Sequence, residues 1–306
     1  MLPSSLLNAL TAFPLPAQKW AHLLLRATLA PPDTLTGWSL ADRNPQIIEQ
    51  LLPFYGWLYE YYFRVQTSGW QNIPGGPVLL IGSHNGGLAA PDMLMMTYDW
   101  FRQFGTERLV YGLMEPKIWR FLPPLARLAT QVGALQARPQ MAIAALEQGA
   151  SLLIYPGGPQ DVFRPYSQRH QINLGHNYGF IKLALQYKIP IIPLISQGAH
   201  STLCVWADLY PQIQQLRQKG MPWPTVIDLE VFPLYWGLPW GLAVGPWPNI
   251  PLPLQLHTRV CPPIEFERYG EAASRQHDYV QECHALVSTL MQEQLDQLVR
   301  ETGLPY

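Results

Sequence analysis

Charge is scarce in this chain. Only 13% of its 306 residues are Asp, Glu, Lys or Arg, which is about half the usual share in a soluble domain. The net charge of −1 provides no general basic field, so the composition argues against nucleic acid as a partner. Low charge together with 48% apolar residues also argues against a disordered protein and predicts a folded domain with a full core.

Cysteine is equally scarce. The three cysteines, Cys204, Cys261 and Cys283, are odd in number and far apart, so they form neither a disulfide framework nor a metal-ligand pattern. This usage is typical of a reducing compartment. The eight histidines show no ligand spacing either, and we expect no metal. The first residues lack a basic segment followed by a compact apolar run, so we expect no cleaved signal peptide.

The longest segment without charged residues, 231–258, is not expected to form a membrane-spanning helix. Residues 231–258 contain no Asp, Glu, Lys or Arg and are long enough to cross a bilayer. However, prolines inside a helix cost about 3 kcal/mol each, and this segment is rich in them. We therefore expect a non-helical Pro/Trp-rich segment. It is either a loop packed on the core or a surface that contacts a bilayer or lines an acyl pocket. Its prolines are Pro233, Pro239, Pro246, Pro248, Pro251 and Pro253.

The N-terminal part is a second candidate for lipid contact. Residues 54–63 are mostly aromatic, and helical spacing places Ile47, Leu51, Phe54, Leu58 and Tyr62 on one face. No polybasic run is present to attract anionic lipid. The helix either docks on a membrane or lies on its own domain. We divide the chain into an N-terminal helical segment, 1–63, which is our candidate for membrane docking, and an α/β domain, 64–306, that contains the Pro/Trp-rich insert 231–258.

After residue 70, short apolar runs alternate with helical patterns, which predicts an α/β fold. We expect a central, mostly parallel sheet flanked by helices, preceded by the helical, membrane-proximal segment. The predicted strands are 77–82, 108–114, 151–155, 190–195, 225–232 and 254–260. The predicted helices are 91–104, 118–129, 140–148, 176–186 and 273–300.

The first candidate site follows the strand at 77–82. His84 lies just beyond its carboxyl end, where open α/β sheets bind ligands. Gly86 and Gly87 let the chain turn back, and Asp92 falls in the first turn of the next helix. A carboxylate bonded to Nδ1–H would leave Nε2 as a general base, and glycine amides could face an oxyanion. The alternative is structural, with Asp92 serving the helix dipole.

A second glycine turn follows the strand at 151–155. Its residues are Pro156, Gly157 and Gly158, with Asp161 and Arg164 next along the chain. A Pro-Gly-Gly sequence is a turn signal first. Because parallel strands share one carboxyl edge, this turn also brings Asp161 and Arg164 to the same edge of the sheet as His84.

Together these segments resemble the glycerolipid (lysophospholipid) acyltransferase superfamily, and more closely its monoacylglycerol/diacylglycerol acyltransferase-like branch. The similarity covers roughly residues 64–300. The superfamily pairs a histidine with a later aspartate, and the branch resembles this chain in its His-x-Gly-Gly turn with a delayed Pro-Asp. Later blocks at 179–184, 189–193, 235–239 and 261–264 also fit. The resemblance implies His84 and Asp92 as catalytic residues and a substrate or oxyanion site formed by Asn85, Gly86, Gly87, Pro156, Gly157, Gly158, Asp161, Arg164 and Lys182.

One departure from the superfamily bears on the acceptor. Members that handle phosphate carry Phe-Pro-Glu-Gly-Thr-Arg where this chain has residues 155–160, so Gln160 stands in place of the arginine. A guanidinium grips phosphate bidentately, and an amide cannot supply that charge. We therefore expect an uncharged acceptor: diacylglycerol, monoacylglycerol, a phytol-like alcohol or a quinol.

The resemblance implies an O-acyltransferase with no cofactor, which takes acyl-CoA or acyl carrier protein as co-substrate. We expect a peripheral or monotopic protein on the cytoplasmic side of a membrane, whose partners are the lipid alcohol, the acyl donor and the membrane surface. The alternatives are a lysophosphatidate or other lysophospholipid acyltransferase, an esterase, or a lipid-binding protein on the same fold. A serine esterase would carry Gly-x-Ser-x-Gly, and Ser83 is wrongly placed for that motif.

Overall fold

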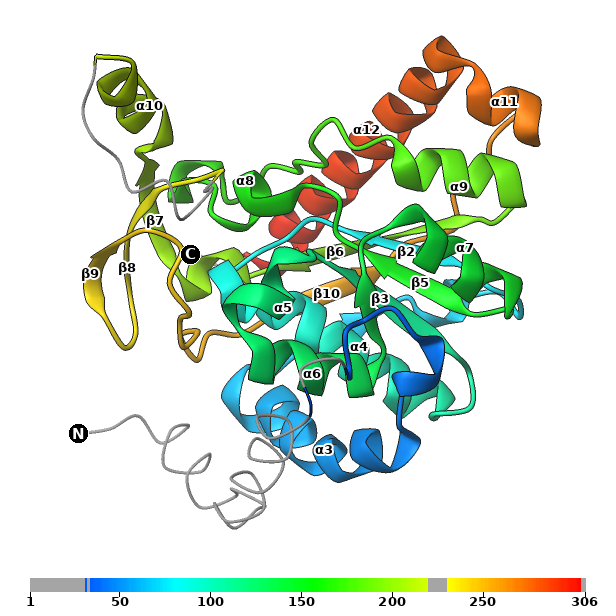
Figure 1. Cartoon of the computed structure of the whole chain (residues 1–306), viewed down its shortest axis with the longest axis horizontal. Coiled ribbons are helices and arrows are strands. Elements are labelled where there is room, and N and C mark those ends of the chain that lie inside the picture. Colours follow the sequence, from blue (N-terminus) through cyan, green and yellow to red (C-terminus); the bar gives the residue numbers. More distant parts are fainter. Residues whose placement is uncertain (1–30, 32–33, 220–229, 304–306) are drawn as a thin grey trace.

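The computed structural model describes residues 31, 34–219 and 230–303. Its centre is a seven-stranded sheet in the order β1-β10-β6-β2-β5-β3-β4 (Figure 1). The strands from β6 to β4 are parallel, whereas β10 pairs with β6 in antiparallel orientation and β1 runs parallel to β10. The predicted α/β fold with a mainly parallel central sheet is confirmed. The strands are β1 (Gln66–Ser68), β2 (Leu79–Gly82), β3 (Val110–Met114), β4 (Ala134–Gln136), β5 (Ser151–Ile154), β6 (Ile191–Gln197) and β10 (His257–Val260).

Helices cover both faces of this sheet (Figure 1). The side chains of β2 alternate between two cores: Leu79 and Ile81 belong to the core under α7, α9 and α12, and Leu80 packs with Met96 and Trp100 of α4. A strand that is buried on both faces has a continuous run of apolar residues, and this run is the pattern from which β2 was predicted. The helices on the first face are α7 (Pro139–Glu147), α9 (Gly179–Tyr187), α11 (Glu271–Arg275) and α12 (His277–Thr302); those on the second are α3 (Pro45–Trp57), α4 (Pro91–Phe104), α5 (Lys117–Phe121) and α6 (Pro123–Val132).

A second, three-stranded antiparallel sheet stands at one side of the molecule, next to α10 (Tyr210–Gln218) (Figure 1). It consists of β7 (Cys204–Asp208), β8 (Pro233–Gly237) and β9 (Gly241–Val244). The Pro/Trp-rich segment is non-helical as predicted, but it is not simply a loop. Pro233 begins β8 and Pro239 lies in the turn between β8 and β9, positions where a missing N–H does not interrupt the pairing.

Several predicted elements differ in their extent. The helix predicted at 118–129 is two helices, because Pro123 disfavours helical backbone at Leu122. The helix predicted at 273–300 is likewise broken at Gln276. Most of the strand predicted at 225–232 lies outside the described residues, and positions 230–232 are not in a strand. The remaining short elements are η1 (Leu40–Asp42), η2 (Leu58–Tyr62), η3 (Trp70–Asn72), η4 (Gly87–Ala89), α8 (Gly158–Val162), η5 (Tyr166–Gln168) and η6 (His200–Thr202).

The described part of the N-terminal segment packs on its own domain. Asn44 caps α3, its side chain accepting hydrogen bonds from the amides of Gln46 and Ile47, and the helix packs against α4 and α6. Tyr59 and Phe63 of the aromatic run are buried. The membrane-proximal role predicted for this segment is not confirmed, and residues 1–30 lie outside the described part. Within the described residues, no helix is both long and apolar enough to cross a membrane.

Candidate active site

The carboxyl ends of three neighbouring strands bring the candidate residues together. His84 follows β2, Tyr155 follows β5, and His200 follows β6. The rings of His84 and Tyr155 are tilted by 32° with their centroids 4.6 Å apart. This is the edge of the sheet at which the sequence placed the site.

The turn after His84 requires its glycines. Gly86 has φ of 76° and Gly87 has φ of 70°, in the left-handed region that glycine adopts without strain. A Cβ on Gly86 would also lie 2.6 Å from Oγ1 of Thr202. The tight turn ends at Pro91, the first residue of α4, which places Asp92 in the first helical turn as predicted.

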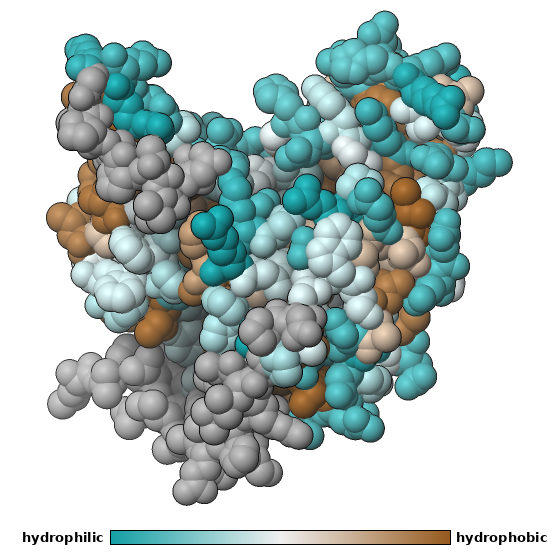
Figure 2. All heavy atoms as spheres, in the orientation of Figure 1, coloured by the Kyte–Doolittle hydropathy of each residue, from teal (hydrophilic) through white to brown (hydrophobic). Residues whose placement is uncertain are grey.

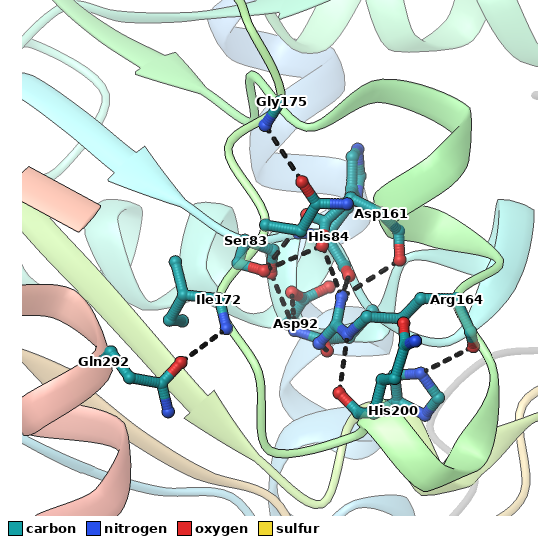
Figure 3. A network of polar contacts seen from close by, with 12 residues as sticks. Ser83, His84, Asp92, Asp161, Arg164, Ile172, Gly175, His200 and Gln292 are labelled. Atoms are coloured by element: carbon teal, nitrogen blue, oxygen red, sulfur yellow. Dashed lines mark hydrogen bonds and ion pairs between the residues drawn. The ribbon is translucent and has the colours of Figure 1, made fainter. Parts of the chain in front are cut away.

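A buried ion pair ties the two glycine turns together (Figure 3). Arg164 and Asp161 are 4% and 0% exposed, and Nη1 of Arg164 lies 2.5 Å from Oδ1 of Asp161. Arg164 also donates to the backbone oxygen of His84 at 2.7 Å and to Oδ1 of Asn85 at 2.6 Å. Asp161 accepts from the hydroxyl of Ser83 and from the amide of His84. The pair therefore fixes the backbone on both sides of the candidate base.

Arg164 is occupied by this network. Its Nε donates to the carbonyl of Gln168 at 3.2 Å, so all three guanidinium nitrogens have acceptors inside the protein. Arg164 therefore positions the His84 turn, and the substrate-binding role that the resemblance implies for it stays a prediction. Lys182 is exposed on α9, which packs on α11 and α12, and its role in binding stays a prediction.

Asp92 is buried, and Asn85 connects it to Arg164. The Asn85 amide nitrogen donates to Oδ2 of Asp92 at 3.0 Å and to the carbonyl of Ser83 at 2.7 Å. The predicted hydrogen bond between His84 and Asp92 is not formed. Instead, Nδ1 of His84 and Oδ1 of Asp92 are both buried without a hydrogen-bond partner in the described part of the chain. Catalytic hydrogen bonds are often long or misaligned without substrate and tighten when it binds.

Burial shifts the acid–base behaviour of these groups. It lowers the pKa of His84 to about 4, helped by the positive charge of Arg164, so the imidazole is neutral at pH 7. Burial raises the pKa of Asp92 to about 7, against the hydrogen bond from Asn85 and the charge of Arg164. Burial also raises the pKa of Asp161, but the guanidinium of Arg164 opposes this and stabilises its carboxylate. A neutral imidazole is the form that accepts a proton.

The Pro-Gly-Gly turn is held closely beneath the segment 173–177. The side-chain Nδ2 of Asn177 donates to the carbonyl of Pro156 at 2.5 Å. A Cβ on Gly157 would lie 2.1 Å from the backbone oxygen of Asn173, so this position requires glycine. Gly158 begins α8 with φ of 62°. These residues build the turn that carries Asp161 and Arg164 to the His84 loop.

Three residues at the site were not predicted. Tyr155 contacts the His84 ring, and its place directly after β5 was a signal available in the sequence. His200 is buried, and its Nε2 lies 3.0 Å from the carbonyl oxygen of Arg164; it too follows a strand closely. Asn249 donates to the carbonyl of Gly86 at 3.0 Å and accepts from the amide of Ala89 at 3.3 Å. Its separation of about 160 residues from the turn leaves no local signal.

In the described ranges 34–219 and 230–303, His, Cys, Asp and Glu form no cluster suited to a metal ion.

A structural relative shares this fold. The chain is similar to the crystal structure of the 1-acyl-sn-glycerophosphate (LPA) acyltransferase PlsC from Thermotoga maritima, with a TM-score of 0.50 and 13% sequence identity. The similarity covers 95% of this chain and 97% of the Thermotoga chain. At this identity the likeness concerns the fold alone.

The matches to relatives found by sequence include a smaller share of the relatives' chains. Uncharacterized proteins of Mycobacterium tuberculosis and Mycobacterium bovis are 25% identical over 225 residues, 72% of this chain and 57% of theirs. A chicken (Gallus gallus) protein named "DGAT1/2-independent enzyme synthesizing storage lipids" is 28% identical over 134 residues, 44% of this chain and 38% of its own. The chain thus spans little more than half the length of the mycobacterial relatives.

Residues 64–197 match the family model described as Acyltransferase, and this stretch contains both glycine turns, His84, Asp92, Asp161 and Arg164. This match covers less than half of the chain and makes this part of it similar to acyltransferases.

Proposed function

We propose that this chain is an O-acyltransferase that moves a fatty acyl group from an acyl thioester, on coenzyme A or acyl carrier protein, to the hydroxyl of a neutral lipid alcohol. The observation that carries the proposal is the environment of His84. Its ring is neutral, its backbone is clamped by Arg164 and Asp161, and it lies within the segment that matches the acyltransferase family. The chain would act at the cytoplasmic face of a membrane, where the lipid acceptor resides.

In this mechanism Nε2 of His84 accepts the proton of the acceptor hydroxyl as its oxygen attacks the thioester carbonyl. The tetrahedral intermediate collapses, the C–S bond breaks, and the proton passes from His84 to the leaving thiolate. A thioester is already activated, so no covalent acyl-enzyme is required. The carboxylate of Asp92 stabilises the transient imidazolium through the buried Nδ1 and Oδ1, and amides of the 85–87 turn face the oxyanion.

The acceptor follows from the charges at the site. Gln160 is exposed and uncharged, and the guanidinium of Arg164 already has acceptors inside the protein. A phosphate buried without compensating charge is strongly disfavoured. We therefore favour diacylglycerol, monoacylglycerol, a phytol-like alcohol or a quinol. The name of the chicken relative, which refers to storage-lipid synthesis, agrees with this choice.

A lysophosphatidate acceptor is the second candidate. The Thermotoga chain with the same fold is an LPA acyltransferase. One cation could serve a phosphate: Arg169 is half-buried, and its Nε is buried without a hydrogen-bond partner in the described part of the chain. Burial lowers the pKa of His200, and the charges of Arg164 and Arg169 add to this effect; the ring of His200 contacts the carbonyl of Arg164.

A competition assay separates these acceptors. Purified protein receives a labelled acyl thioester with equal concentrations of diacylglycerol, a long-chain alcohol and lysophosphatidate. We expect the uncharged alcohols to be preferred at least ~10-fold, equivalent to about 1.4 kcal/mol in transition-state binding. Preference for lysophosphatidate that Arg169→Ala abolishes would establish the second candidate. Free acid alone would indicate a hydrolase, and no product would indicate a lipid-binding protein.

A further inference from the structure

The outer face of the second sheet is apolar. In β7 to β9, Val205 and Tyr235 point inward and pack with Phe163. The outward positions are Trp206, Trp236, Leu242 and Val244, joined at the turns by Trp240 and Trp247; Leu242 is 61% exposed and Trp247 is 55% exposed. Apolar residues gather along this side of the molecule (Figure 2). An antiparallel sheet that packs one face on the core usually carries polar residues on the other. We call this surface the outer hairpin face.

The chemistry of the outer hairpin face matches a bilayer. The whole segment 231–258 lacks Asp, Glu, Lys and Arg, so none of these side chains opposes its transfer out of water or requires anionic lipid. Two of its three indole N–H groups are already paired: Trp240 donates to the carbonyl of Pro248 at 2.7 Å and Trp247 to that of Val244 at 2.8 Å. These tryptophans can enter lipid without leaving a donor unpaired, and their rings are suited to the headgroup region.

The segment that follows β9 contacts the His84 turn. Asn249, which follows β9, holds the carbonyl of Gly86 and the amide of Ala89. On the inner side, Leu203 and Tyr235 join the core cluster that contains Phe163, next to Arg164. A lipid surface contacting this sheet would therefore lie beside the candidate active site.

We propose that the outer hairpin face docks in the headgroup–acyl boundary of an uncharged bilayer and presents the His84 turn to lipid alcohols. The purpose of the docking rests on the proposed function, whereas the docking itself does not. Insertion is shallow, because β9 is an edge strand whose unpaired backbone groups are disfavoured in hydrocarbon. Interfacial elements of this kind bury to a depth of about 5–10 Å.

Vesicle flotation tests the proposal without requiring activity. The full chain is mixed with phosphatidylcholine vesicles, with and without about 1 M sodium chloride, where the Debye length is about 3 Å. We expect flotation that survives salt. Leu242→Glu, and separately Val244→Glu, should weaken partitioning at least ten-fold. The matched control is Leu286→Glu, which places the same charge on an exposed leucine of α12 and should float like the parent chain. Circular dichroism and thermal unfolding verify that each variant is folded.

Four outcomes would overturn the proposal: no flotation of the parent chain, release by salt, a requirement for anionic lipid, or undiminished flotation of both hairpin variants. A dimer that Leu242→Glu dissociates, in a chain that does not float, would also overturn it and would make this face an interface between copies. Because none of these readouts measures product, failure of the docking proposal and failure of the proposed acyl transfer are distinguishable.

Discussion

Replacing Asp92 by asparagine should stabilise the fold while it removes activity. Burial raises the pKa of Asp92 from 3.8 to about 7, so the folded protein binds this proton more tightly than the unfolded chain does. The stability that this group contributes is present at low pH and is lost as pH rises toward and through 7. Above pH 8 the ionised carboxyl costs the fold about 4 kcal/mol, and asparagine avoids that cost. After altered hydrogen bonding is included, we expect a net gain of about 1–3 kcal/mol at pH 8, with a smaller gain at pH 5.

The assay is thermal or urea unfolding at pH 5 and pH 8, with acyl transfer measured in parallel. Asp161→Asn is the matched control, because it too neutralises a buried carboxyl but leaves Arg164 without its partner. Breaking a buried pair in this way costs about 3–5 kcal/mol, so this variant should be destabilised. The reasoning is refuted if Asp92→Asn loses stability at pH 8 as Asp161→Asn does, or if it keeps parental turnover.

Two further substitutions test the His84 turn. His84→Ala should lower turnover about 10²–10⁴-fold, because it removes the general base, while the unfolding temperature changes little; near-parental turnover would contradict the mechanism. Asn249→Ala removes two hydrogen bonds to the turn, so we expect a loss of about 1–3 kcal/mol in unfolding free energy and a lower kcat. Urea unfolding and initial rates measure both effects, and an unchanged kcat would show that Asn249 supports the fold alone.

The sequence predicted the parts of the fold that depend on local pattern. The buried strands β2, β5 and β6 are short apolar runs, and α4 begins at Pro91 as its proline-first signal indicated. It did not predict β1, β4 or β7, which are short and owe their conformation to pairing with neighbouring strands rather than to their own residues. The sequence also did not predict the antiparallel pairing of β8 with β9. The many prolines of that segment suggested a loop.

The sequence by itself placed the candidate residues at one edge of the sheet, since His84 and the Pro-Gly-Gly turn each follow a strand, and parallel strands end at one edge. The tertiary structure alone decided which partners each of these side chains contacts. Arg164 was expected to bind substrate, yet burial forces a charged group to find acceptors, and the fold supplies Asp161, Asn85 and the carbonyl of His84. Asn249 contacts the turn although it lies 163 residues from Gly86 in the sequence, and local sequence pattern does not encode such a contact.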